Sequence, residues 1–128
     1  MNPMKILLVD DEQEFVAALA ERLELRGYQV EAVNSGEEAL QAVEAAPPKA
    51  VVLDVKMPGL SGLEVLKSIK AQFPSMPVLL LTGYGSTEDG MKGMRFGAYD
   101  YLMKPLNIED LIKKIHEAVG AAEEKPPH

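Results

Sequence analysis

The feature that most constrains this chain is a run of four apolar residues, 50–53, that leads directly into Asp54. A strand buried on both faces of a parallel sheet has a continuous apolar run rather than an alternation. Asp54 then lies where this strand ends, and residues 57–59 turn the chain away. In open α/β sheets, chemistry gathers beyond the carboxyl ends of the strands. An acid that simply begins a turn explains the same pattern, so the other strands decide between these interpretations.

Apolar runs alternate with helical periodicities along the whole chain. The expected strands span residues 4–9, 28–33, 50–54, 77–81 and 99–103. Ser35 and Ser61 each precede a glutamate by three residues, which is the spacing of a capping box that begins a helix. Gly90 and Gly93 weaken the helix expected over residues 86–95, because each glycine costs about 1 kcal/mol relative to alanine.

Five successive strand–helix units predict an α/β fold, a parallel sheet covered by helices on both faces. The doubly wound, flavodoxin-like arrangement of five strands has the order 2-1-3-4-5, with a switch point between the first and third strands. We expect one domain over residues 4–120. Residues 121–128 are small, charged and proline-rich, which predicts a frayed tail or the start of a linker.

The composition excludes several classes of function. Thirteen basic and twenty acidic residues give a net charge of −7, so the chain lacks the basic surface of a nucleic-acid binder and is repelled by anionic lipid. There is no cysteine, and the two histidines are His116 and His128, so thiolate chemistry and a histidine-rich metal site are excluded. No apolar run approaches the roughly 20 residues of a membrane span. We expect a cytoplasmic protein without a nucleic-acid or membrane partner.

Polar side chains follow four of the five expected strands. Asp10 and Asp11 follow the first strand, Asp54 the third, Thr82 the fourth and Lys104 the fifth. The strand order 2-1-3-4-5 makes these strand ends neighbours along one edge of the sheet. Alone, each residue has an ordinary structural explanation as a cap, a turn residue or a solvated charge. Their occurrence at successive strand ends favours a shared site.

The residue types at these strand ends indicate phosphoryl chemistry. Neighbouring carboxylates raise one another's pKa unless a cation neutralises them, and hard oxygen ligands suit Mg²⁺. Lys104 is a compact charge suited to a phosphoryl oxygen, and Thr82 is able to donate a hydrogen bond to another. Asp54 lies centrally, so it is the predicted nucleophile that forms an aspartyl phosphate.

These motifs resemble the receiver domain of bacterial two-component response regulators, over residues 4 to about 120. The matching pieces are Val9-Asp10-Asp11, Leu53 to Gly59, Ser61-Gly62, Leu81-Thr82-Gly83 and Lys104-Pro105. The resemblance implies that Asp54 accepts a phosphoryl group from a sensor histidine kinase or a histidine phosphotransfer protein. It does not identify that kinase, the downstream target or an output domain.

The resemblance also implies a ligand set and a special peptide bond. Mg²⁺, with Mn²⁺ as a possible substitute, would be bound by Asp11, Asp54 and the main-chain carbonyl of Lys56, and Asp10 would contact the ion through water. A cis peptide is expected between Lys104 and Pro105, where an X–Pro bond makes the cis form accessible.

A conformational switch is a further implication of the resemblance. Thr82 would move toward the phosphoryl group and Tyr101 would turn inward behind it. The surface formed by the fourth helix, the fifth strand and the fifth helix would then change, and members of the family commonly form homodimers through that surface. Met91 and Met94 are side chains able to repack there.

The resemblance implies two positions that vary in the family and lie near the mouth of the site, Lys56 and Tyr84, and Gly83 beside Tyr84 is a third residue expected to modulate the site. We hypothesise that Tyr84 limits the access of water and lengthens the lifetime of the phosphoryl group. Gly83 is small and would act in the opposite direction by widening access.

Two alternatives remain open at this point. A phosphatase of the haloacid-dehalogenase type also uses an aspartate nucleophile, but it needs a second acid two residues later, where this chain has Lys56. A phosphate-independent interaction module would be expected to lack part of the site, and none of the five residues is missing. We therefore expect a phosphoacceptor protein that catalyses only its own phosphorylation and dephosphorylation.

Overall fold

Five parallel strands and five helices alternate along the chain. The computed structural model describes residues 3–83 and 87–124. The strands are β1 (Lys5–Val9), β2 (Gln29–Val33), β3 (Ala50–Asp54), β4 (Val78–Thr82) and β5 (Asp100–Met103). The helices are α1 (Gln13–Leu25), α2 (Gly36–Ala45), α3 (Gly62–Gln72), α4 (Thr87–Arg95) and α5 (Ile108–Glu124).

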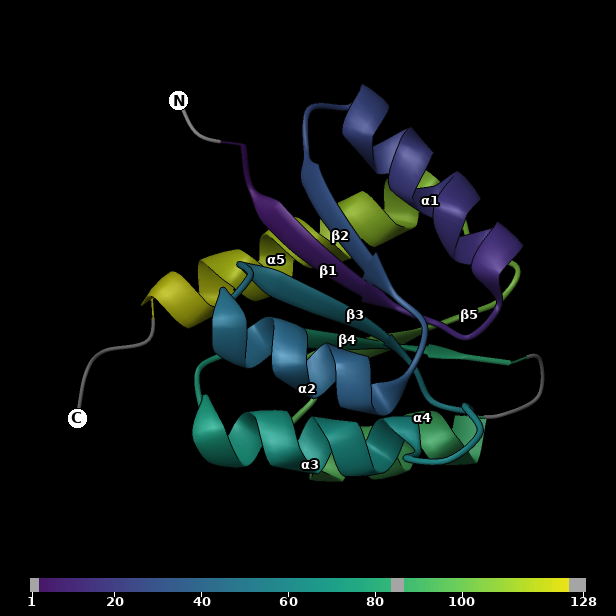
Figure 1. Ribbon diagram of the computed structural model, residues 1–128. Helices are drawn as coiled ribbons and strands as arrows, with labels where there is room; N and C mark the ends of the chain where they lie inside the picture. Colours follow the sequence, from purple (N-terminus) through teal and green to yellow (C-terminus); the bar gives the residue numbers. More distant parts are fainter. Residues whose placement is uncertain (1–2, 84–86, 125–128) are drawn as a thin grey trace.

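The strands form one sheet in the order β2-β1-β3-β4-β5 (Figure 1). The predicted flavodoxin-like topology is confirmed. The register pairs Val9 with Leu53, Asp54 with Leu81, and Thr82 with Met103. All strands run in the same direction, so their carboxyl ends meet at one edge of the sheet.

The sheet is the middle layer of a three-layer sandwich. Helices α1 and α5 cover one face, and α2, α3 and α4 cover the other (Figure 1). Alternate residues of β1 serve the two faces: Leu7 and Val9 pack toward α2 and α3, whereas Ile6 and Leu8 pack toward α1 and α5. The central strands β3 and β4 are buried along their whole length, which explains their continuous apolar sequences.

Helix α4 lies close to the sheet because glycines form its inner face. A Cβ atom on Gly90 would lie 2.6 Å from the ring of Tyr101, and one on Gly93 would collide with the side chain of Leu80. Both glycines are buried. The two residues that weaken this helix in the sequence are therefore the residues that allow it to pack.

Helix α5 extends beyond the expected end of the domain. Residues 121–124 are helical rather than frayed, because alanine and glutamate are strong helix formers that continue the helix past Gly120. Residues 125–128 lie outside the described part of the chain. None of the helices within the described ranges has the length and apolar character needed to cross a lipid bilayer.

Candidate functional site

The carboxyl edge of the sheet brings Asp10, Asp54, Thr82 and Lys104 together, as the sequence predicts. Asp10 follows β1 directly, Asp54 and Thr82 end β3 and β4, and Lys104 follows β5. Asp10, Asp54 and Thr82 are the buried polar side chains among the described residues, with 1%, 5% and 1% of their surfaces exposed. Burying polar groups is unfavourable unless they are paired, so this concentration marks a site.

Backbone contacts fix the two buried carboxylates. The N–H of Glu12 donates to Asp10 Oδ1 at 2.9 Å, and the N–H of Lys56 donates to Asp54 Oδ1 at 3.4 Å. Gly62 lets the loop after β3 fold back against that strand end, because a Cβ atom there would collide with the carbonyl oxygen of Asp54. The loop geometry therefore depends on a residue without a side chain.

Lys104 is held on the β1 side of the site. Its Nζ lies 2.8 Å from Asp10 Oδ2 and 2.8 Å from Glu12 Oε1, but 3.9 Å from Asp54 Oδ2. The ring of Phe15 covers it, with the centroid 4.5 Å from Nζ. The peptide bond between Lys104 and Pro105 is cis, as the resemblance leads us to expect.

The electrostatics of the site favour the binding of a proton or another cation. The pKa of the Asp54 carboxyl is raised to about 7, first by burial and then by the negative charge of Asp10. Lys104 and the Lys56 N–H act in the opposite direction by favouring the carboxylate. Burial lowers the pKa of Lys104, but hydrogen bonds to Asp10 and Glu12 outweigh burial, so its pKa is raised and it stays charged.

Three carboxylates are able to hold a metal ion here. One oxygen from each of Asp10, Glu12 and Asp54 lies within 4.8 Å of the others. An all-oxygen donor set suits a hard cation such as Mg²⁺, and the negative charge of Asp10 contributes, after burial, to the raised pKa of Asp54. Asp11, which the resemblance makes a direct ligand, is exposed and is not one of the three.

Glu12 is the site residue that sequence reasoning missed. It is the third of three consecutive acids after β1, and the sequence carries no signal that tells which of them faces the site. The structure shows that the Glu12 side chain faces the site, because its Oε1 lies 2.8 Å from Lys104 Nζ.

Comparison with known proteins gives the same assignment as the geometry. A sequence model described as the response regulator receiver domain matches residues 6–116. The chain belongs to the response regulator receiver domain family. Domains of this family are generally phosphoacceptor signalling domains, so the phosphoacceptor interpretation holds, and the haloacid-dehalogenase-type phosphatase and the phosphate-independent module do not.

Individual relatives agree with this family assignment. The chain is 42% identical over 112 residues to the response regulator MprA of Mycobacterium leprae, covering 88% of this chain and 49% of MprA.

Two crystal structures of response regulator receiver domain proteins are similar to this chain. That from Clostridium thermocellum is 34% identical, with a TM-score of 0.88 over 94% of this chain and 97% of the other. That from Methanospirillum hungatei is 32% identical, with a TM-score of 0.90 over 97% and 99%. The chain spans about half the length of the curated relatives it matches.

The two expected switch residues of this receiver domain lie on neighbouring strands. The Thr82 hydroxyl donates to the carbonyl of Leu102 at 3.5 Å, and the Lys104 N–H donates to the carbonyl of Thr82 at 2.9 Å. Tyr101 is partly buried, with its ring against Gly90 of α4. Thr82 is therefore linked through the β5 backbone to both Lys104 and the strand that carries Tyr101.

The positions expected to modulate the receiver site are only partly described. Lys56 is exposed beside Asp54, and Gly83 is partly buried directly after Thr82. Tyr84 lies outside the described residues.

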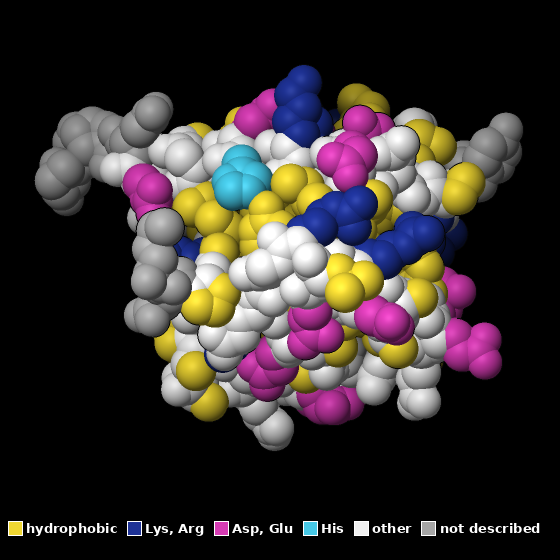
Figure 2. Space-filling model, turned by 90° about the horizontal axis from the view of Figure 1, so that it is seen from above, with side chains coloured by type: hydrophobic (Ala, Val, Ile, Leu, Met, Phe, Trp, Pro, Cys, Tyr) yellow, Lys and Arg dark blue, Asp and Glu magenta, His cyan; other side chains and the backbone are white. Residues whose placement is uncertain are grey.

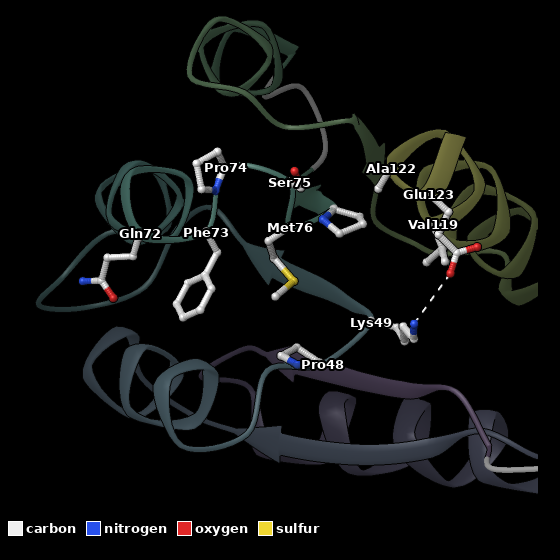
Figure 3. A pocket seen from close by; sticks show the side chains of 11 residues that line it. Pro48, Lys49, Gln72, Phe73, Pro74, Ser75, Met76, Val119, Ala122 and Glu123 are labelled. Carbon is white, nitrogen blue, oxygen red and sulfur yellow. Dashed lines mark ion pairs between the residues drawn. The ribbon is translucent and has the colours of Figure 1, made fainter. Parts of the chain in front are cut away.

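Two other features of the receiver domain lie outside this site. His116 is exposed on α5 (Figure 2) and forms a hydrogen bond with the Tyr28 hydroxyl, so it is a surface residue. A hollow of about 430 Å³ lies between the chain preceding β3, the chain preceding β4 and the end of α5 (Figure 3). It is lined by Phe73 and Met76, and the Lys49–Glu123 ion pair, 3.6 Å long, lies beside it. The residues that line this hollow come before β3 and β4 in the chain, so the hollow lies at the opposite edge of the sheet from Asp54.

Proposed function

We propose that Asp54 is the phosphoacceptor of this receiver domain and takes its phosphoryl group from a phosphohistidine of a sensor kinase or phosphotransfer protein. The observation that carries this proposal is a buried carboxylate at a strand end, 3.9 Å from a lysine ammonium and beside a second buried acid. A group with a pKa of about 7 is substantially ionised at neutral pH, so its carboxylate is available as a nucleophile.

The transfer is a displacement at phosphorus. A carboxylate oxygen of Asp54 attacks the phosphorus atom while the bond from phosphorus to the imidazole nitrogen of the donor breaks. The electron pair of that bond stays on the nitrogen, and the product is an acyl phosphate. Little covalent chemistry is required of the protein, so positioning and charge neutralisation provide most of the catalysis.

Asp11, Asp54 and the carbonyl of Lys56 would hold Mg²⁺ at this site, and Asp10 would contact the ion through water. Glu12 is a further carboxylate in the cluster with Asp10 and Asp54. When bound, the ion neutralises the clustered carboxylates and the charge on the phosphoryl oxygens. Mn²⁺ accepts similar oxygen ligands and would substitute for it.

Lys104 and Thr82 are the remaining groups proposed to contact the phosphoryl oxygens. Lys104 supplies a positive charge, and the Thr82 hydroxyl would exchange its 3.5 Å hydrogen bond to Leu102 for a stronger one to a phosphoryl oxygen. That movement, together with an inward turn of Tyr101, would alter the surface of α4, β5 and α5. A downstream target, an output domain or a second copy of the chain would then bind that surface.

The bound phosphoryl group would later be lost to water, so the domain would catalyse its own dephosphorylation. Access of water to Asp54 would depend on Lys56, Gly83 and Tyr84. A cytoplasmic location follows from the proposed kinase partner and remains part of this proposal.

The test is intact-mass measurement after incubation with acetyl phosphate and Mg²⁺. We expect one phosphoryl adduct on the wild-type protein, none without Mg²⁺ and none on Asp54→Asn. The matched control is Asp110→Asn, because Asp110 is an exposed acid on α5 with no ion pair to a described residue. An adduct on Asp54→Asn, or none on any protein, would contradict the proposal.

A further inference from the structure

The ammonium of Lys104 is bound to Glu12 rather than to Asp54. Its contacts with Asp10 and Glu12 are both 2.8 Å long, whereas its distance to Asp54, 3.9 Å, is beyond a hydrogen bond. The lysine is therefore retained on the α1 side of the site, away from the carboxylate that would carry the phosphoryl group.

The position of Glu12 is set by the backbone at the start of α1. Its N–H donates to Asp10 at 2.9 Å, and its carbonyl accepts the first hydrogen bond of the helix, from Val16, at 3.0 Å. The Phe15 ring covers the lysine from the same helix. One short segment thus supplies two of the contacts that retain Lys104, and it does so without using Asp54.

The two carboxylates that bind Lys104 differ in exposure. The Asp10 side chain is 2% exposed, so water is unable to replace its bond to the ammonium. The Glu12 side chain is 63% exposed, so water readily replaces that bond. Asp10 is therefore the better protected partner of Lys104, and Glu12 is the partner that Lys104 leaves more readily.

We propose that Glu12 is a positioning residue that retains Lys104 while Asp54 is unphosphorylated, and thereby slows phosphoryl acceptance. Phosphoryl oxygens on Asp54 would compete with Glu12 for the same ammonium, so the ion pair with Glu12 stabilises only the unphosphorylated state. Negative charge on Glu12 would also repel the anionic donor. This inference rests on the proposed role of Asp54.

The variant Glu12→Gln removes the charge and keeps the shape. We expect the initial rate of phosphorylation by acetyl phosphate, at saturating Mg²⁺, to rise about two- to fivefold, the range that corresponds to loss of one exposed ion pair. The matched control is Glu14→Gln, since Glu14 is an exposed acid in the first turn of the same helix and has no ion pair with a described residue. The control removes the same charge, so its rate should remain close to the wild-type rate.

Titrating Mg²⁺ separates positioning of the lysine from metal binding. Glu12 belongs to the acid cluster, so its loss is expected to raise the Mg²⁺ concentration needed for half-maximal rate. Release of Lys104 from residue 12 should instead change the plateau, which is the phosphorylation rate at saturating Mg²⁺. A plateau at or below the wild-type value, or an equal increase in Glu14→Gln, would overturn the inference.

A crystal structure of metal-free Glu12→Gln provides a readout that is independent of activity. We expect the distance from Lys104 Nζ to Asp54 Oδ2 to shorten from 3.9 Å to hydrogen-bond length, about 3 Å. An unchanged lysine position would overturn the inference while leaving the proposed function intact. Absence of a phosphoryl adduct on all proteins, wild type included, would instead overturn the proposed function and the inference with it.

Discussion

At the scale of single residues, polar side chains gather at the strand ends, and the Asp54 carboxyl has the most strongly shifted pKa among them. Its pKa is raised to about 7 because burial and Asp10 both disfavour the charged form. A buried charge that its partners compensate only in part destabilises the folded state, so the property proposed to prepare Asp54 for phosphoryl transfer also reduces stability.

Stability without Mg²⁺ should depend on pH through Asp54. A carboxyl group whose pKa is higher in the folded chain than in the unfolded chain binds its proton more tightly when folded. Protonation of Asp54 therefore stabilises the folded state. This stabilisation is fully present below about pH 4, the pKa of the group in the unfolded chain, and is lost as the pH rises through about 7, its pKa in the folded chain. We expect Asp54→Asn, which has no charge, to be more stable than wild type by about 1–3 kcal/mol at pH 8, a range reduced for solvent screening.

Urea denaturation at pH 5 and pH 8 measures this difference. The advantage of Asp54→Asn should be smaller at pH 5 than at pH 8, and the exposed control Asp110→Asn should show neither effect. An advantage that is equal at both pH values would indicate a packing effect and contradict the electrostatic explanation.

The sequence predicts Asp54, Thr82 and Lys104 because each follows an apolar run that defines a strand end. It does not predict that Glu12 binds Lys104, a contact between residues 92 positions apart. That contact depends on how the loop after β1 turns, and three consecutive acids give no local signal of that turn.

At the scale of the elements, α4 combines an unfavourable helical sequence with close packing against the sheet. Gly90 lies against the Tyr101 ring, and Gly93 lies against Leu80. Helical periodicity predicts the location of this helix, whereas the need for glycine depends on its distance from the sheet. The sequence likewise predicts the location of α5 but not its C-terminal end, because helix-forming residues extend this helix to Glu124, beyond the expected end.

Alanine substitution should have opposite effects at two helical glycines. Gly90→Ala places a Cβ atom 2.6 Å from the Tyr101 ring, so we expect a loss of about 1–3 kcal/mol in the free energy of unfolding. Gly120→Ala in α5 is the matched control, because nothing lies within 4 Å of its Cβ position. It should gain about 0.5–1 kcal/mol from helix propensity. Urea denaturation measures both, and stabilisation by Gly90→Ala would contradict the close packing of α4.

At the scale of the whole molecule, the fold is the part that the sequence predicts best. Strand and helix placement follow from the alternation of buried runs and amphipathic helices, and the known order of five-stranded doubly wound sheets then brings the strand ends of the site to one edge. The net charge of −7 and the cluster of acids at one edge of the sheet also affect the stability of the whole fold. The folded chain gathers negative charge that the unfolded chain separates.

A divalent cation should therefore stabilise the folded molecule as a whole. The unfolded chain does not hold Asp10, Glu12 and Asp54 together, so Mg²⁺ binds the folded state preferentially and shifts the unfolding equilibrium by mass action. At ten times its dissociation constant, Mg²⁺ should add about 1.4 kcal/mol to the free energy of unfolding and raise Tm. Asp10→Asn should lose most of this gain, whereas Asp110→Asn should keep it, and NaCl at equal ionic strength controls for screening. If NaCl reproduced the whole shift in Tm, general screening of the net charge rather than a metal site would explain the stabilisation.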